Sequence, residues 1–250
     1  SIEKPILEIL AKYGITCDKS PKPDTKRDWT EASDLTLCGK LMTDTPNPYH
    51  RVDTVKYKGF TKSENGQVRM SSGISVAFKT NSSEIHVKTK YGTVVSFPTN
   101  TNGIGASAPS DKNLEAPVRL VSNMDDTMKE CLLYLPLYSE EYSVQIGVDK
   151  GSVIEAIDNP FRYRVGIFGS SYTHGSSTSR GGMTYPAQFS RNTGIQMLSL
   201  GCSGNSKLQQ YFADVLCDAK VDALVFDAFS NPDAKMIEAR LFPFIEKLRA

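Results

Sequence analysis

The chain has 250 residues and a mass of 27.5 kDa, enough to bury one large or two ordinary hydrophobic cores. A formal net charge of +1 gives no reason to expect nucleic acid as a partner, and no stretch is apolar enough to span a membrane. The five cysteines are scattered, and their spacing fits neither a zinc site nor a dense disulfide framework. They are expected to be small buried side chains, with one disulfide left open as an alternative.

Residues 1–39 are expected to form a short helix followed by a polar arm. Apolar residues recur at helical spacing between Ile2 and Tyr13, and Gly14 would end such a helix. Residues 17–35 are polar, with two prolines and many charges, which favours a linker or an arm along the surface. The chain begins with serine rather than methionine, so the removal of a leader stays open.

Residues 40–158 show the alternating pattern of β-strands and almost no helical spacing. Short runs of alternating apolar residues are separated by turn-rich stretches, and these runs begin near Val55, Ile74, Ile85, Cys131 and Tyr142. The pattern predicts an all-β sandwich of the jelly-roll type. The long polar stretch 99–113 is predicted to be a loop.

Residues 159–250 alternate between strand and helix patterns. Buried-strand runs at 164–168, 195–200 and 223–227 are each followed by helical spacing, at 185–192, 208–216 and 236–248 respectively. This order predicts an α/β fold, a flavodoxin-like doubly wound parallel sheet built from right-handed βαβ units. Three such strands would leave a hydrophobic edge unpaired. The sheet is therefore expected to be incomplete, with a C-terminal fragment or a second copy covering that edge.

Each of these three strands is followed by an unusual loop, and parallel strands bring such loops to one edge of the sheet. In the first loop, Ser171 can expose its hydroxyl and place its amide at a helix N-terminus. Thr173 stands where the α/β-hydrolase elbow requires glycine, which disfavours that family. The second loop, 201–205, contains glycines that let a backbone amide approach a substrate oxygen, without the spacing of a dinucleotide fingerprint. Each loop alone could equally be an ordinary turn.

The third loop carries Asn231, whose side-chain amide can donate to an oxyanion. Asn231 could instead cap the helix that follows, a role for which Asp233 also competes.

In combination the loops resemble the SGNH (GDSL-type) hydrolases. That family has Gly-Asp-Ser with a glycine four residues after the serine, then Asn-x-Gly-x-x-Gly, an asparagine loop and Asp-x-x-His. The first three blocks are matched by 169–175, by 199–204 with serine in the leading position, and by Asn231. Further segments resemble a bacterial subgroup in which a β-sandwich precedes the hydrolase domain: 49–53, 133–138, 179–185 and 200–205.

The resemblance implies a serine esterase that acts on small acyl esters, such as acetyl groups on carbohydrates, in the periplasm or outside the cell. It assigns Ser171 as the nucleophile, with the amides of Ser171 and Gly204 and the side chain of Asn231 as the oxyanion hole. It implies no metal and no organic cofactor. The residues expected to contact the substrate are Ser170, His174, Arg180 and Asn205.

Two departures from the family pattern bear on this hypothesis. Ser170 replaces the aspartate of the first block, a position where the subgroup accepts Ser or Thr. The Asp-x-x-His block is absent, so no general base for Ser171 is apparent. His50 and His86 are expected to belong to the β-sandwich, and His174 to line the site or pack its loop. The base is therefore expected beyond residue 250, and a catalytically silent carbohydrate-binding or structural protein is the alternative.

Overall fold

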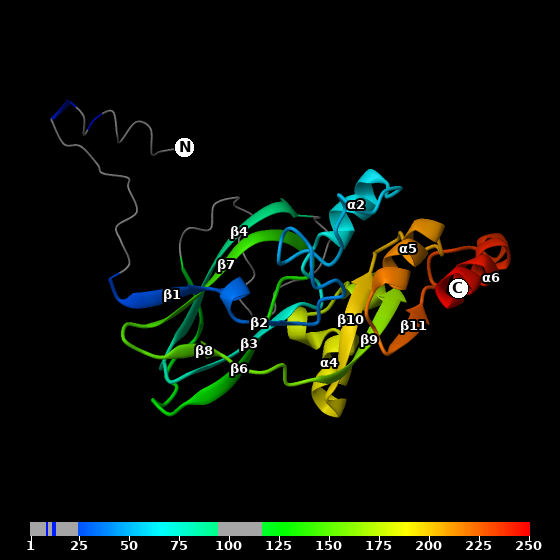
Figure 1. The fold of residues 1–250 in the computed structure, drawn as a ribbon. Helices are drawn as coiled ribbons and strands as arrows, with labels where there is room; N and C mark the ends of the chain where they lie inside the picture. The colour runs from blue at the N-terminus through cyan, green and yellow to red at the C-terminus, as the bar shows by residue number, and fades with distance from the viewer. Residues whose placement is uncertain (1–8, 10–11, 14–24, 95–116) are drawn as a thin grey trace.

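The computed structural model describes residues 9, 12–13, 25–94 and 117–250 (Figure 1). The expected N-terminal helix and the 99–113 loop lie outside these residues.

Two antiparallel sheets form the first half of the chain. The four strands of the first sheet follow the order β1 (Arg27–Glu31), β7 (Ser139–Asp149), β4 (Ile85–Val94) and β5 (Val118–Val121). The second sheet has the order β2 (Thr36–Cys38), β3 (Ser75–Thr80) and β6 (Lys129–Tyr134), with β8 (Ile154–Ala156) also paired to β3. Side chains of both sheets, among them Phe78, Val144 and Ile146, form one apolar core with Tyr49 and Ile74 from the segment between β2 and β3. The predicted antiparallel β domain is confirmed.

Three local predictions in this half were wrong. Part of the expected polar arm forms β1, the 3₁₀ helix η1 (Ala32–Asp34) and β2, because β1 pairs along its whole length with the end of β7. The expected strand near Val55 is a turn, in which the Asp53 carboxylate accepts the amides of Val55 and Lys56 at 2.8 and 3.1 Å. A helix that the alternation pattern did not indicate, α2 (Lys62–Val68), begins at a capping box formed by Thr61 and Glu64.

A parallel sheet forms the second half, with the order β10 (Ile195–Gly201), β9 (Arg162–Gly169) and β11 (Ala223–Asp227). All three predicted strands are confirmed, as are the three longer helices. Gly194 ends the first of these with φ of +73°, as its position predicts. The helices of this half are α3 (Ser171–His174), the 3₁₀ helix η2 (Gly181–Met183), α4 (Tyr185–Thr193), α5 (Gln210–Asp218) and α6 (Ala234–Arg249).

The two halves share a hydrophobic core, although their sheets are separate (Figure 1). Leu41, Val52 and Val68, from the segment that connects β2 to β3, pack in one cluster with Phe168 of β9 and Phe212 of α5. Each such buried side chain contributes on the order of 1.5–3 kcal/mol. The expected boundary at residues 158–159 therefore separates two kinds of sheet, while the packing continues across it.

β11 is an edge strand within the part of the chain that the structure describes, and Val225 on it is 43% exposed. A partner that covers this edge stays a prediction. None of the four described cysteines forms a disulfide.

Candidate active site

The three loops begin at one level of the parallel sheet. Gly169 of β9 is in register with Gly201 of β10 and with Asp227 of β11. Backbone bonds join the strand ends across the sheet: the Ser170 amide donates to the Asp227 carbonyl at 3.1 Å, and the Cys202 amide to the Gly169 carbonyl at 2.9 Å. The strand ends therefore place Ser171, Gly204 and Asn231 at the same edge of the sheet, as the sequence predicts.

Ser171 is the first residue of α3, directly after its N-cap. Ser170 is fully buried, and its hydroxyl accepts the Tyr172 amide at 3.4 Å. Ser171 itself is partly exposed, and its hydroxyl has no hydrogen-bond partner among the described residues. A short helix that begins at the nucleophile directs free backbone amides toward a developing negative charge. Ser170 acts as a cap, and its burial does not fit the expected contact with substrate.

Close packing of α3 against the strand ends explains two glycines. A Cβ atom on Gly169 would lie 1.9 Å from Thr173 Oγ1, and one on Gly201 would lie 2.2 Å from the His174 amide nitrogen. Any larger residue would push α3 away from the sheet. Both glycines therefore set the position of Ser171.

Gly204 lies at an exposed turn in the left-handed region, with φ of +72°. A Cβ atom on it would have no neighbour within 4 Å, so the space beside its backbone is open. Its amide finds no acceptor in the described ranges. The residue can thus offer an unused donor to a substrate oxygen.

Asn231 contacts the Gly204 loop rather than capping α6. Its Oδ1 accepts the Ser206 amide at 3.3 Å, which leaves the Nδ2 group free to donate. Asp233 is the N-cap of α6, and its carboxylate accepts the Met236 amide at 2.8 Å. The two open roles are therefore divided between these residues, and Asn231 can serve as an oxyanion donor.

A polar triangle at the end of β11 was not predicted. Thr173 Oγ1 and the Tyr185 hydroxyl both donate to Asp227 Oδ2, at 2.7 and 2.9 Å, and the two hydroxyls lie 2.8 Å apart. Burial, with Asp227 beside the hydroxyl, raises the pKa of Tyr185 to about 12. The triangle ties α3 and the start of α4 to β11. The only local signal was an aspartate at the carboxyl end of a buried strand.

His174 is fully buried, so its side chain is not accessible to a substrate. Its Nε2 lies 2.8 Å from the Leu137 carbonyl, and its ring stacks on Tyr138 with centroids 4.1 Å apart. Burial, helped by the positive charge of Arg51, lowers the pKa of His174 well below its ordinary value. Of the two roles expected for His174, loop packing fits this position and lining the substrate site does not.

The other two histidines pair with acids in the antiparallel half. His50 Nε2 lies 3.0 Å from Glu140, and His86 Nε2 lies 2.8 Å from Glu84. All three histidine rings of the chain are therefore occupied away from the Ser171 hydroxyl.

The remaining expected substrate contacts differ from each other. Arg180 is exposed on the loop before η2, where its backbone carbonyl accepts the Met183 amide at 2.9 Å and its side chain has no partner among the described residues. Asn205 is half-buried, and its side-chain amide donates to Ser63 Oγ and to the Ser203 carbonyl at 3.0 and 3.1 Å. Asn205 thus holds its own loop, while Arg180 stays available to a ligand.

No group of three or more His, Cys, Asp or Glu residues in the described ranges could hold a metal ion. No helix within those ranges is both long and apolar enough to cross a bilayer.

Family models match both halves of the chain. Residues 162–250 match the GDSL-like Lipase/Acylhydrolase family, and residues 27–108 and 104–154 match the N-terminus of Esterase_SGNH_hydro-type proteins. A protein from Bacteroides ovatus assigned as a GDSL-like lipase has a similar solved structure, with 34% sequence identity and a TM-score of 0.82 over 89% of this chain and 70% of that one. The chain belongs to the SGNH/GDSL-like hydrolase family.

A second solved structure shares the fold at lower identity. It is the salicylyl-acyltransferase SsfX3 from a tetracycline biosynthetic pathway, with 20% identity and a TM-score of 0.66, over 90% of this chain and 70% of that one. No curated protein sequence matches the chain. Membership of the family makes an ester-hydrolysing type of activity the relevant chemistry.

Proposed function

We propose that the protein is a serine esterase that hydrolyses small acyl esters, with acetyl esters of carbohydrates as the substrate class. Ser171 Oγ attacks the ester carbonyl carbon and passes its proton to a general base, giving a tetrahedral oxyanion. The amides of Ser171 and Gly204 and the Nδ2 group of Asn231 stabilise that oxyanion. One such donor is worth about 10²–10³ in rate.

The observation that carries this proposal is the bond from the Ser206 amide to Asn231 Oδ1. It fixes the Oδ1 end of the side chain on the Ser206 amide, and it leaves the Nδ2 group without a partner among the described residues. Because Asp233 is the N-cap of α6, Asn231 is not needed for that role, and its amide group can donate to a substrate oxygen.

Two features support the substrate class. Family resemblance suggests small acyl esters. Tyr172 directly follows Ser171, and Phe229 lies two residues past the end of β11; their side chains are 67% and 48% exposed. Exposed aromatic rings can pack against the face of a sugar. The periplasmic or secreted location stays a prediction.

One observation favours the alternative, a catalytically silent glycan-binding protein. None of the three histidines approaches the Ser171 hydroxyl, so they do not supply the base that the mechanism needs. In that case the protein would bind a glycan ester and release it unchanged.

Substitution of the nucleophile separates these possibilities. In the full-length protein, Ser171→Ala should abolish hydrolysis of p-nitrophenyl acetate while the melting temperature changes little, because the hydroxyl has no partner to lose. Ser177→Ala, at an exposed serine on the same segment, is the matched control and should keep full activity. Hydrolysis that persists in Ser171→Ala would mean another nucleophile, and an inactive wild type that binds glycans would favour the alternative.

A further inference from the structure

We propose that Arg51, Gln67 and Tyr138, all from the antiparallel half, are positioning residues that hold the oxyanion loop, residues 201–205, in its working shape. The inference rests on the proposed function, since it assigns a purpose to contacts around Gly204. Under this inference the antiparallel half contributes to catalysis by positioning the oxyanion loop, whether or not it also contacts the substrate.

Gly204 needs such support because its own loop constrains it weakly. Glycine in the left-handed region has many accessible conformations, and the loop contains a single internal backbone bond, from the Asn205 amide to the Cys202 carbonyl at 3.0 Å. An oxyanion donor must be held within a fraction of an ångström of its productive position. The remaining restraint has to come from neighbouring segments.

Arg51 supplies it at the start of the loop. This side chain is fully buried, and all of its hydrogen bonds go to backbone carbonyls. One guanidinium nitrogen bonds both the Gly201 carbonyl at 2.9 Å and the Ser199 carbonyl at 3.2 Å. The guanidinium also bonds the Met70 and Gln67 carbonyls at 2.9 and 2.6 Å. The end of β10 is therefore fixed to α2 at the point where the strand becomes the loop.

Gln67 and Tyr138 hold the residue directly before Gly204. The side-chain amide of Gln67, 2% exposed, donates to the Ser203 carbonyl at 3.0 Å. The Tyr138 hydroxyl lies 2.7 Å from Ser203 Oγ. On the other side of Gly204, the Asn205 side chain is held by Ser63. Contacts from α2 and from the segment before β7 thus bracket the glycine whose amide is the proposed donor.

The test compares two buried glutamines that bridge the same halves of the molecule. Gln67→Met removes the bond to Ser203, whereas Gln196→Met removes the bond from the Gly39 amide to Gln196 Oε1, 3.0 Å long, at the opposite end of β10. Gln196 is 3% exposed and plays no part in the site. Both variants are made in the full-length protein, and kcat, KM and melting temperature are measured with p-nitrophenyl acetate.

Gln67→Met should lower kcat about tenfold or more with KM within about twofold, because a displaced oxyanion donor weakens binding of the transition state alone. Gln196→Met should lower the melting temperature similarly and leave kcat unchanged. Tyr138→Phe is a milder second variant, to be used if Gln67→Met fails to fold. It should lower kcat several-fold.

The outcomes keep the two proposals apart. A wild type without Ser171-dependent hydrolysis overturns the proposed function, whatever the glutamine variants do. With Ser171-dependent activity established, equal kcat values for the Gln67 and Gln196 variants overturn the positioning role. So does a rise in KM at constant kcat, which would mean that Gln67 contributes to substrate binding instead.

Discussion

Two polar clusters, one at each end of β7, use their hydrogen-bonding groups in opposite ways. The strand runs from Ser139, next to the segment that contacts the oxyanion loop, to Asp149, which is about 33 Å of extended chain. At the Asp149 end, one carboxylate oxygen accepts four hydrogen bonds from residues of one turn. At the candidate active site, the Ser171 hydroxyl and the proposed oxyanion donors have no hydrogen-bond partner among the described residues.

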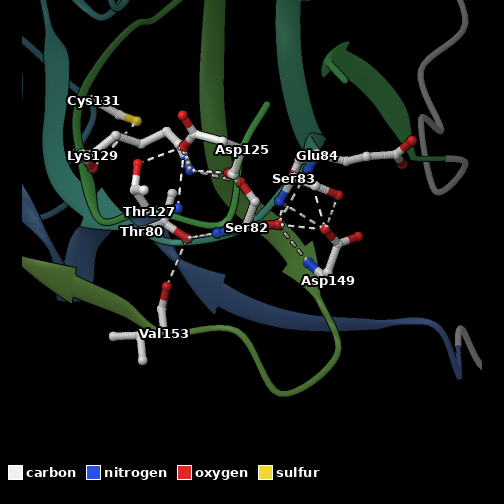
Figure 2. A network of polar contacts seen from close by, with 10 residues as sticks. All are labelled: Thr80, Ser82, Ser83, Glu84, Asp125, Thr127, Lys129, Cys131, Asp149 and Val153. Atoms are coloured by element: carbon white, nitrogen blue, oxygen red, sulfur yellow. Dashed lines mark hydrogen bonds and ion pairs between the residues drawn. The ribbon is translucent and has the colours of Figure 1, made fainter. Parts of the chain in front are cut away.

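The Asp149 cluster fixes the turn between β3 and β4 (Figure 2). One carboxylate oxygen accepts the Ser83 amide at 2.9 Å, the Glu84 amide at 3.2 Å, the Ser83 hydroxyl at 2.7 Å and the Ser82 hydroxyl at 3.0 Å. These bonds, those of Ser83 above all, lower the pKa of Asp149. Nearby, Lys129 donates to the carbonyls of Ser82 and Asp125 at 3.1 and 2.7 Å. These hydrogen bonds are made within the protein, and together they hold the turn between β3 and β4 in place.

At the site, the Ser171 hydroxyl, the Gly204 amide and Asn231 Nδ2 remain without partners among the described residues. Their surroundings, by contrast, are firmly bonded: Asp227 holds Thr173, and Arg51 holds Gly201. Free donors on a well-fixed frame are what electrostatic stabilisation of a transition state requires. The contrast suggests that satisfied clusters serve stability in this fold, and unsatisfied accessible groups serve chemistry.

After loss of the nucleophile, the largest effect should come from Asn231. Asn231→Ala removes the proposed oxyanion donor, so kcat for p-nitrophenyl acetate should fall about 10²–10³-fold. Asn231→Asp keeps an acceptor for the Ser206 amide but replaces the donor with a negative charge, so it should lose at least as much activity while its melting temperature stays near that of the wild type. An Asn231→Ala variant whose kcat stays within threefold of the wild type would remove Asn231 from the mechanism and break the comparison on the catalytic side.

Asp149 should show the reverse pattern. Asp149→Ala leaves several donors without an acceptor, so the free energy of unfolding at neutral pH should fall by on the order of 2 kcal/mol, while kcat at a permissive temperature is unchanged. Asp126→Ala, at an exposed acid near the same cluster, is the control and should change neither quantity.

The pH dependence of this loss follows from the lowered pKa of Asp149. A carboxyl group with a depressed folded-state pKa stabilises the fold above its ordinary pKa, and that stabilisation is lost as the pH falls through the folded-state pKa. Urea titrations should therefore show the gap between Asp149→Ala and the wild type shrinking in strongly acidic solution. A gap that is constant with pH would mean that the carboxylate charge is not what the turn uses.

Local patterns sufficed where neighbours in the sequence decide the structure. Gly194 ends α4, and the strand at 223–227 is found with the predicted bounds. The same reasoning failed near Val55, where the alternation of apolar residues and lysines resembles a strand. Asp53 instead closes a turn, and the Tyr57 side chain packs in the shared core. The start of α2 was predictable in principle, since a Thr61–Glu64 capping box is a local signal.

The site was only partly predictable, for a different reason. Ser171, Gly204 and Asn231 follow strands, and parallel topology alone brings them to one edge. The contacts that position them join residues far apart in the chain: Arg51 and Gly201 are separated by 150 positions, and Gln67 and Ser203 by 136. The helical or alternating pattern of apolar residues in a sequence cannot predict contacts between residues so far apart. The burial of His174 likewise depends on Tyr138, which comes from the antiparallel half.

Glu141 gives the sharpest test of the comparison, because it is an unsatisfied group that is not accessible. It is 1% exposed on β7, its Oε1 accepts the Ser139 hydroxyl, and its Oε2 has no partner in the described part of the chain. Burial raises the pKa of Glu141 to about 7. Here the folded protein binds a proton more tightly than the unfolded chain does. Stability is therefore greatest below the ordinary pKa and declines as the pH rises toward the folded-state pKa.

Glu141→Gln should remove that decline, since an amide cannot ionise. At pH about 8 the variant should be more stable than the wild type by on the order of 3 kcal/mol, and at pH about 5 by much less. Glu130→Gln, at an exposed acid on β6, is the control and should shift stability little at either pH. Urea titrations at the two pH values provide the measurement. If Glu141→Gln instead changed the free energy of unfolding equally at both pH values, ionisation of the Glu141 carboxyl group would not destabilise the folded protein. An unsatisfied buried group would then be tolerated here, and the lack of partners at Ser171, Gly204 and Asn231 would lose its value as a sign of function.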